Sequence, residues 1–216
     1  LYTGDFKLGE SATAERAELP RAEILVIEST YGHPDYRLPP REEALGLLFD
    51  EVRRALESGA LPIVEAYSLG KGQEITRLLT LQGFSVLQHE QIYQTSRVYE
   101  SLGVDLGHYG LLADDAERDC VWVVPPRTRM HDETARQIRF AVTGWAVDES
   151  AKYRFKVDHA IPLSDHADYD ELFEAVARVD AQEVYCTHGP ESFVDRLRDA
   201  GFNARPLGRP SRPRLF

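Results

Sequence analysis

The sequence predicts an α/β protein built on a mainly parallel β-sheet. Strand-like and helix-like segments alternate along most of the 216 residues, which is the pattern of repeated strand–helix–strand units. Residues 22–27 and 61–67 are largely apolar runs, as expected for strands that are buried on both faces of a parallel sheet. Between them, Leu48, Val52 and Leu56 recur with the period of a helix.

Turn-forming residues separate the elements expected in the first half of the chain. Residues 1–6 and 22–27 are expected strands that stop at Gly4-Asp5 and at Glu28. A proline-rich break at residues 36–40 marks a candidate domain boundary. The elements expected next are a helix at 41–58 that is closed by Gly59, a strand at 61–67, a helix at 74–81, a strand at 84–88 and a helix at 91–102.

The second half continues the alternation and ends in a basic stretch. Asp168 and Glu171 have the spacing of a capping box, which predicts a helix from Asp168 to Val179. Residues 205–214 hold four arginines, three prolines and no acid, which predicts a flexible basic tail. The other expected elements are strands at 120–124, 140–147, 153–161 and 183–186, and helices at 132–140 and 191–200.

The composition is that of an ordinary soluble globular protein, with 43% hydrophobic and 28% charged residues. No run approaches the ~18 apolar residues of a membrane span, and no charged-then-apolar leader opens the chain. Cys120 and Cys186 both lie in apolar runs, so we expect reduced core thiols and a cytoplasmic location. The net charge of -11 argues mildly against a nucleic-acid partner, although a local basic groove can hold phosphate inside an acidic envelope.

Four segments place an acidic residue or a histidine where a strand-like run stops. These residues are Asp5, Glu28, His166 and His188. In open α/β proteins the carboxyl ends of the strands form the edge at which ligands bind, so we expect one polar cluster there. A carboxylate at the position of Glu28 is usually paired or functional, because an unpaired buried charge is costly. The plainer alternatives are that Thr-Gly-Asp is a simple turn and that both histidines only satisfy hydrogen bonds at strand ends.

Two further segments are weaker candidates for binding phosphate. Ser68 and Lys71 lie in a glycine-rich turn at residues 68–74, which lacks the Walker A pattern. Arg127 and Arg129 follow the strand expected at 120–124 and could present guanidinium groups to phosphate. The alternative for residues 68–74 is a tight turn that needs no ligand, and the alternative for Arg127 and Arg129 is a solvated loop.

Four short motifs, in this order, resemble those of the β-CASP nucleases, a branch of the metallo-β-lactamase fold. The segments are Tyr2-Thr3-Gly4-Asp5, Glu28-Ser29-Thr30-Tyr31-Gly32, Ser164-Asp165-His166-Ala167-Asp168 and Thr187-His188-Gly189. The turn at residues 68–74 is also similar to the turn that opens the inserted domain of that family. The residues of these motifs are most similar to those of bacterial exonucleases described as DNA-ligase-associated. The branch also includes the endonuclease subunit of RNA 3′-end processing.

The resemblance implies a metal-dependent phosphodiesterase with two zinc ions. Asp5 would bridge the metals and His188 would ligate one of them. His166 would act as general acid on the leaving oxygen, and Glu28 would orient its ring. The implied partners are RNA or single-stranded DNA, together with DNA-ligase-linked repair proteins, and no membrane. RNA and DNA both stay open, as do exonuclease and endonuclease action, with exonuclease favoured.

The resemblance is incomplete at one point. The His-x-His-x-Asp-His loop that supplies most metal ligands in the family is not found in these residues, and no other pair of histidines has a spacing that could replace it. We therefore expect the C-terminal part of a metallo-β-lactamase αββα sandwich with an inserted Rossmann-like β-CASP domain, weak or no zinc binding, and no activity of the chain alone. Residues 1–35 and 158–216 would belong to the sandwich, and residues 36–157 would form the insert.

Two readings from other classes stay open. A catalytically silent scaffold would bind nucleic acid or a partner without cleavage, but such subunits usually lose the site residues that are present here. A small-molecule metallohydrolase of the same superfamily is the other. The long insert argues against this alternative, because a second domain is useful for clamping a polymer and a small substrate does not need one.

Overall fold

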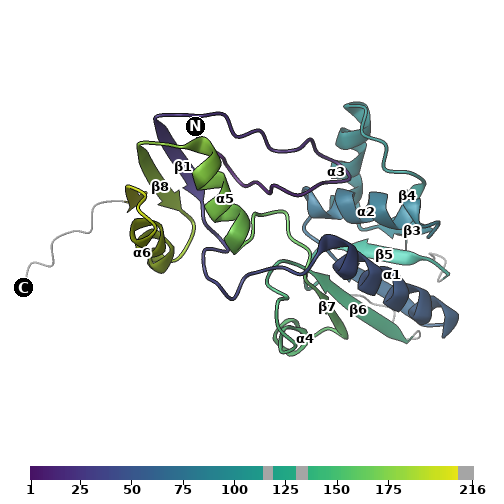
Figure 1. The fold of residues 1–216 in the computed structure, drawn as a ribbon. Coiled ribbons are helices and arrows are strands. Elements are labelled where there is room, and N and C mark those ends of the chain that lie inside the picture. The colour runs from purple at the N-terminus through teal and green to yellow at the C-terminus, as the bar shows by residue number, and fades with distance from the viewer. Residues whose placement is uncertain (114–118, 130–135, 209–216) are drawn as a thin grey trace, which may run out of the picture. The chain divides into compact units, whose positions relative to one another are not determined.

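The structure is a computed structural model that describes residues 1–113, 119–129 and 136–208. The chain divides into two compact units (Figure 1). Unit 1 consists of Leu1–Gly9, Arg16–Arg37 and Asp165–Phe216, and unit 2 consists of Glu10–Glu15 and Leu38–Ser164. Both units contain parallel sheets with helices packed on them, so the predicted α/β class with mainly parallel strands is confirmed.

Unit 1 is a three-stranded parallel sheet with two helices. The strands β1 (Ile24–Glu28), β8 (Glu183–Thr187) and β9 (Ala204–Pro206) pair in the order β1-β8-β9. Helices α5 (Tyr169–Val179) and α6 (Glu191–Asp199) belong to the same unit. The strands and helices share one core, which includes Leu25, Ile27, Leu172, Val184 and Phe193.

Helix α5 begins where its capping box predicts. The Asp168 side chain accepts a hydrogen bond from the Glu171 backbone N–H at 2.9 Å, and the Glu171 side chain accepts one from the Asp168 N–H at 3.2 Å. This reciprocal pair satisfies two donors that the first turn of a helix otherwise leaves free. The helix then buries Leu172 and Val176 against the sheet. Because the cap fixes the start of α5, it also fixes the position of the segment before it, which contains His166.

Unit 2 is a six-stranded sheet in the order β4-β3-β5-β2-β6-β7, and every pairing in it is parallel. Its strands are β2 (Leu61–Glu65), β3 (Val86–Gln88), β4 (Tyr109–Leu111), β5 (Val121–Val124), β6 (Gln137–Val142) and β7 (His159–Ile161). Its helices are α1 (Arg41–Glu57), α2 (Lys71–Leu81), α3 (Glu90–Ser101) and α4 (Ala151–Phe155).

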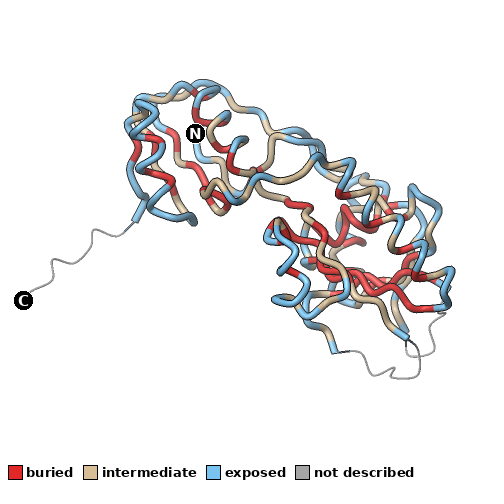
Figure 2. Tube along the Cα trace, turned by 60° about the horizontal axis from the view of Figure 1, so that its bottom comes forward, coloured by how far each residue is buried: buried red, intermediate tan, exposed pale blue. Residues whose placement is uncertain are grey.

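The central strands of unit 2 are buried on both faces, which explains their continuous apolar sequence. Val64 of β2 and Val123 of β5 join the core that α1, α2 and α3 form with the sheet, whereas Ile63 and Trp122 belong to a second cluster. Successive side chains of a strand point to opposite faces, so the two clusters lie on opposite sides of the sheet. The buried stretches concentrate along these strands (Figure 2).

Several expected boundaries are wrong. Residues 1–6 form no strand; Tyr2 makes only an isolated bridge to Val26. The helix expected at 132–140 is wrong over its described part, because β6 runs from Gln137 to Val142. Residues 132–135 lie outside the described residues. Pairing of β6 with both β2 and β7 outweighs the local helical pattern.

The strand expected at 153–161 is also wrong in its first half. Residues 151–155 form the short helix α4, which ends at Lys156 with φ +57°, and only His159–Ile161 is a strand. At the C-terminal side, the basic stretch from Arg205 is not all tail, because Ala204–Pro206 pairs with β8 as β9. Pro206 is tolerated there because β9 is an edge strand. Residues 209–216 lie outside the described residues.

Helix α2 begins at Lys71, three residues before the expected start, because Gly70 with φ +79° permits the turn to close earlier. Both cysteines are buried, and neither forms a disulfide with a residue that the structure describes. Burial raises the pKa of Cys186 to about 12. Within the described ranges, no helix has the length and apolar character needed to cross a membrane.

Candidate functional site at the sheet edge of unit 1

The carboxyl ends of β1 and β8 lie side by side in unit 1. Glu28, the last residue of β1, is opposite Thr187, the last residue of β8, and His188 follows directly. The N-terminal residues run along the other side of β1, because the Thr3 N–H donates to the Val26 carbonyl at 3.0 Å. The N-terminal segment therefore ends, like β1 and β8, at the edge that carries Glu28 and His188, and Asp5 follows it there.

His166 reaches this edge through the segment that precedes α5. The Ala167 backbone N–H donates to the Phe6 carbonyl at 2.5 Å, which ties His166 to the turn that carries Asp5. His166 Nδ1 lies 3.1 Å from Glu28 Oε1, although the two residues are 138 positions apart in sequence. The expected contact between Glu28 and His166 is therefore present. The contact by itself assigns no chemical role to either residue.

The environment of this pair favours the charged form of both partners. Burial alone would raise the pKa of Glu28, which is 1% exposed, but hydrogen bonds from His166 and from Thr30 outweigh burial and lower the pKa. The hydrogen bond with Glu28 raises the pKa of His166, against burial, and the nearby charges of Glu28, Asp5 and Asp165 raise it further. An ionised Glu28 can only accept a hydrogen bond, which fixes a proton on Nδ1 of His166 and leaves Nε2 for other chemistry.

The remaining two candidates are exposed. Asp5 lies near enough to influence the charge of His166, and His188 sits in the left-handed region with φ +61°. Within the part of the chain that the structure describes, no group of three or more His, Cys, Asp or Glu side chains could hold a metal ion. A catalytic zinc normally takes three protein ligands and a water, so these residues by themselves do not fit the two-zinc site that the resemblance implies.

Several known proteins are similar to this chain in sequence, although no family model matches it. A probable DNA ligase of Opitutus terrae is 37% identical over 213 residues, which are 96% of this chain and 21% of that protein. The transcription termination factor FttA of Methanocaldococcus jannaschii is 33% identical over 106 residues, 48% of this chain and 17% of that protein. RNase aCSPSF2 of Saccharolobus solfataricus is 35% identical over 86 residues, 38% of this chain and 17% of that protein.

FttA and aCSPSF2 are β-CASP nucleases, and each match covers less than half of this chain. The chain is a homologue of the β-CASP nucleases. It spans about a fifth of the length of the curated relatives that it matches. A solved protein of unknown function from Enterococcus faecalis V583 superimposes with a TM-score of 0.55 at 14% identity. The match covers 96% of this chain and 56% of that one, and it supports the α/β fold alone.

Sequence reasoning missed the residues that hold the motifs of this β-CASP homologue together. Ser29 is buried, its hydroxyl donates to the Thr187 carbonyl at 3.0 Å, and its N–H donates to the same oxygen at 2.8 Å. A Cβ at Gly189 would lie 2.6 Å from the Ser29 carbonyl carbon and closer still to its oxygen. The segments Glu28-Ser29 and Thr187-His188-Gly189 therefore touch through their backbones. The small residue after Glu28 and the glycine after His188 were the available signals.

Tyr31 is a further motif residue to which sequence reasoning gave no role. It is 2% exposed, and its ring meets that of His166 edge-on, with the centroids 5.8 Å apart and the planes at 85°. It also packs against Tyr36 at 5.3 Å. The β-CASP homologue thus holds the imidazole by a carboxylate at Nδ1 and by an aromatic ring beside it, which limits the rotation of the His166 ring.

The weaker candidates all lie in unit 2. Ser68 is partly buried in the turn before α2, where its carbonyl accepts from the Gln73 side chain at 3.1 Å. Lys71 is 2% exposed, and its Nζ lies 3.7 Å from Glu74 Oε2. Glu74 also binds Arg41 at 2.8 Å, so the structure places Lys71 in an internal network of charges.

Arg127 and Arg129 occupy the loop after β5, and both are exposed. Arg127 lines a pocket of about 460 Å³, with φ +63°, whereas Arg129 does not line it. The four weaker candidates therefore lie in two places. Ser68 and Lys71 share a turn in which the lysine is buried, and Arg127 and Arg129 share a loop from which only Arg127 is directed into the pocket.

Replacing Glu28 by glutamine should lower the pKa of His166, because the variant loses the charge that stabilises the imidazolium. The folded pKa of wild-type His166 lies above the unfolded value of about 6.5. Protonation of His166 therefore stabilises the fold below that pH, and the contribution is lost as the pH rises through the folded pKa. NMR titration of the imidazole checks the first statement, and urea unfolding at about pH 6 and about pH 9 checks the second. A wild-type pKa at or below 6.5 would contradict both.

Proposed function

We propose that the chain is part of a metal-dependent nuclease that hydrolyses phosphodiester bonds of RNA or single-stranded DNA. The observation that carries this proposal is the contact between Glu28 and His166 at the edge where Asp5 and His188 also lie. The nuclease relatives support the same class of reaction. Residues 1–35 and 158–216 would be metallo-β-lactamase segments, and residues 36–157 would be the inserted β-CASP domain.

The roles in this proposal follow from the protonation of the pair. Glu28, ionised and buried, holds the Nδ1–H of His166 and stabilises the imidazolium. His166 then carries a second proton at Nε2, which it donates to the departing 3′ oxygen when hydroxide attacks phosphorus and the P–O3′ bond breaks. The phosphate stays on the 5′ oxygen of the downstream nucleotide, so the products carry 5′-phosphates. Exonuclease action is favoured.

DNA is the substrate that we propose to test first. The relative that matches 96% of this chain bears the name probable DNA ligase, and a nuclease that leaves 5′-phosphates produces the end that a ligase joins. DNA-ligase-linked repair proteins are the partner class that this argument suggests. RNA is the second arm of the test, because RNase aCSPSF2 is also a relative.

The chain alone should not be a competent nuclease. Asp5 and His188 are too few to hold two zinc ions, since a catalytic zinc normally takes three protein ligands. Zinc analysis of the purified chain should find well under two tightly bound ions per molecule, and labelled RNA and single-stranded DNA should stay intact. A longer protein that also carries a His-x-His-x-Asp-His segment should cleave, and chelators should stop it. Strong, chelator-sensitive cleavage by the 216-residue chain would show that the ligand argument is wrong.

A further inference from the structure

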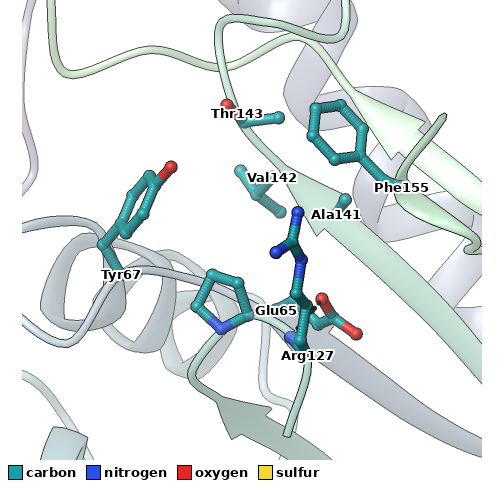
Figure 3. A pocket seen from close by; sticks show the side chains of 8 residues that line it. Glu65, Tyr67, Arg127, Ala141, Val142, Thr143 and Phe155 are labelled. Carbon is teal, nitrogen blue, oxygen red and sulfur yellow. Dashed lines mark hydrogen bonds between the residues drawn. The ribbon is translucent and has the colours of Figure 1, made fainter. Parts of the chain in front are cut away.

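Unit 2 contains a pocket at the carboxyl ends of three neighbouring strands. Its lining comes from the ends of β2 and β6, the loop after β5 and helix α4 (Figure 3). Its volume of about 460 Å³ lies within the range of about 300–1,000 Å³ that is usual for small-molecule sites. The lining residues are Glu65, Tyr67, Pro126, Arg127, Ala141, Val142, Thr143 and Phe155.

The topology of unit 2 explains why a pocket opens at this point. Strand β2 continues through α2 to β3, on the β5 side of the sheet, whereas the neighbouring strand β6 continues through α4 to β7 on the opposite side. Connections that leave adjacent strands in opposite directions leave a crevice outside the carboxyl ends of those strands, and ligands of open α/β sheets bind there. The pocket lies at such a switch point.

One positive charge in the pocket is not neutralised by any residue that the structure describes. Glu65 is 7% exposed, and its Oε1 accepts from Arg139 Nε at 2.9 Å and from the Arg139 terminal nitrogen at 2.6 Å. This bidentate pair cancels the carboxylate charge. The side chain of Arg127 makes no hydrogen bond or ion pair with any residue that the structure describes. The pocket therefore carries about one net positive charge, on the Arg127 guanidinium.

The backbone of Arg127 is held in an unfavourable conformation. Its φ of +63° lies in the left-handed region, which is costly for a residue that has a Cβ. Its N–H donates to Glu65 Oε2 at 3.0 Å, and Arg139 donates to the carbonyl of neighbouring Thr128 at 3.1 Å. Figure 3 shows the Arg127 side chain rising from this anchored loop into the space between Val142 and Ala141.

The rest of the lining suits a flat ring next to an anion. Tyr67 and Phe155 contribute aromatic rings, and Pro126 and Val142 contribute apolar surface. Thr143 accepts from the Trp145 N–H at 3.3 Å, so its hydroxyl proton can be donated to a ligand. We propose that this pocket binds a nucleoside monophosphate group, with the phosphate on Arg127 and Thr143 and the base against Tyr67 or Phe155. The site goes beyond the proposed nuclease activity, because its occupancy requires no cleavage.

A free nucleotide and the 5′-phosphorylated end of a strand present the same chemical group. Calorimetric titration of the 216-residue chain with AMP, adenosine, inorganic phosphate and a short 5′-phosphorylated oligothymidylate separates these sources. AMP should bind more tightly than adenosine or phosphate alone, because only AMP uses the arginine and the aromatic surface together. A much higher affinity for the oligonucleotide would identify the strand end as the natural occupant, and equal affinities would identify the free nucleotide.

Two substitutions at one position test the role of the arginine. Arg127→Gln should weaken AMP binding roughly tenfold, because a hydrogen-bonded charge pair is lost. Arg127→Gly should weaken it equally while folding at least as well as the wild type, since glycine tolerates a positive φ. Arg136→Gln is the matched control, because it removes an exposed arginine of unit 2 that does not line the pocket, and it should bind AMP as the wild type does.

The aromatic surface is tested by Tyr67, a residue that is 57% exposed and whose side chain can be shortened without opening a core cavity. Tyr67→Ala should weaken AMP binding roughly tenfold, in line with the loss of one stacked base, whereas Tyr67→Phe should retain it. Unchanged AMP affinity in Arg127→Gln would overturn the proposal, and so would the absence of binding by both AMP and the phosphorylated oligonucleotide. Neither result would affect the proposed nuclease activity, which depends on residues of unit 1.

Discussion

His166→Ala should lower kcat roughly 10²–10⁴-fold in a protein that joins this chain to the histidine-bearing segment, which is the usual effect of a positioned general acid. The zinc content should stay unchanged, because His166 bonds Glu28 and is not among the proposed ligands. His188→Ala should instead lose zinc together with activity, since it removes a proposed ligand. Single-turnover cleavage and zinc stoichiometry, measured on both variants, separate the two roles.

The matched control for this pair of variants is His108→Ala. His108 is an exposed histidine of unit 2 with no assigned role, so its loss should leave cleavage and zinc content unchanged. Zinc loss in His166→Ala with retention in His188→Ala would mean that the two roles are exchanged. Normal cleavage by both variants would place the reaction elsewhere and refute the proposed function.

Gly189→Ala should destabilise unit 1 by about 1–3 kcal/mol or more, because the new Cβ would overlap the Ser29 backbone. Neither side can yield cheaply, since Ser29 is bonded to Thr187 through both its N–H and its hydroxyl. The clash should also displace Glu28 and weaken its contact with His166. Urea unfolding measures the first effect, and the NMR pKa of His166, which should fall, measures the second.

Gly9→Ala is the control for that substitution. Gly9 also lies in unit 1, but its Cβ would have as its nearest neighbour a Glu171 side-chain oxygen at 3.7 Å, which is an ordinary contact. Its free energy of unfolding should stay within about 0.5 kcal/mol of the wild type. Equal stability of the two variants would show that the segments after β1 and β8 do not pack as closely as the structure indicates.

The contact between Glu28 and His166 was predicted from the family motifs that contain the two residues. Glu28 comes directly after an apolar run, and parallel pairing with β8 brings it to the sheet edge of unit 1. The strand that precedes His166, β7, belongs to the sheet of unit 2, so sheet pairing does not account for the position of His166. A buried carboxylate requires a partner, and His166 satisfies that requirement. The alternation of apolar runs with helical periodicity likewise predicted the parallel α/β class, because burial on both faces leaves a continuous apolar sequence.

In two of the elements that were predicted wrongly, distant pairing outweighs local preference. The helix expected at 132–140 includes Gln137–Phe140, yet pairing with β2 on one side and with β7 on the other holds Gln137–Val142 as a strand. Arg205 and Pro206 have the composition of a tail, yet pairing with β8 makes them an edge strand. Neither partner can be identified from the segment itself.

The sequence by itself determined the fold class and the order of the motifs, because these depend on periodicity and on residue type, and the motifs in turn indicated the pair Glu28 and His166. Only the tertiary structure decided that Ser29 touches Gly189, that Lys71 is buried and that Arg127 lines a pocket with Glu65. Glu65 bonds residues that are 62 and 74 positions away. The order of strands in the sheet creates those contacts, and strand order is a property of the whole chain that no local pattern contains.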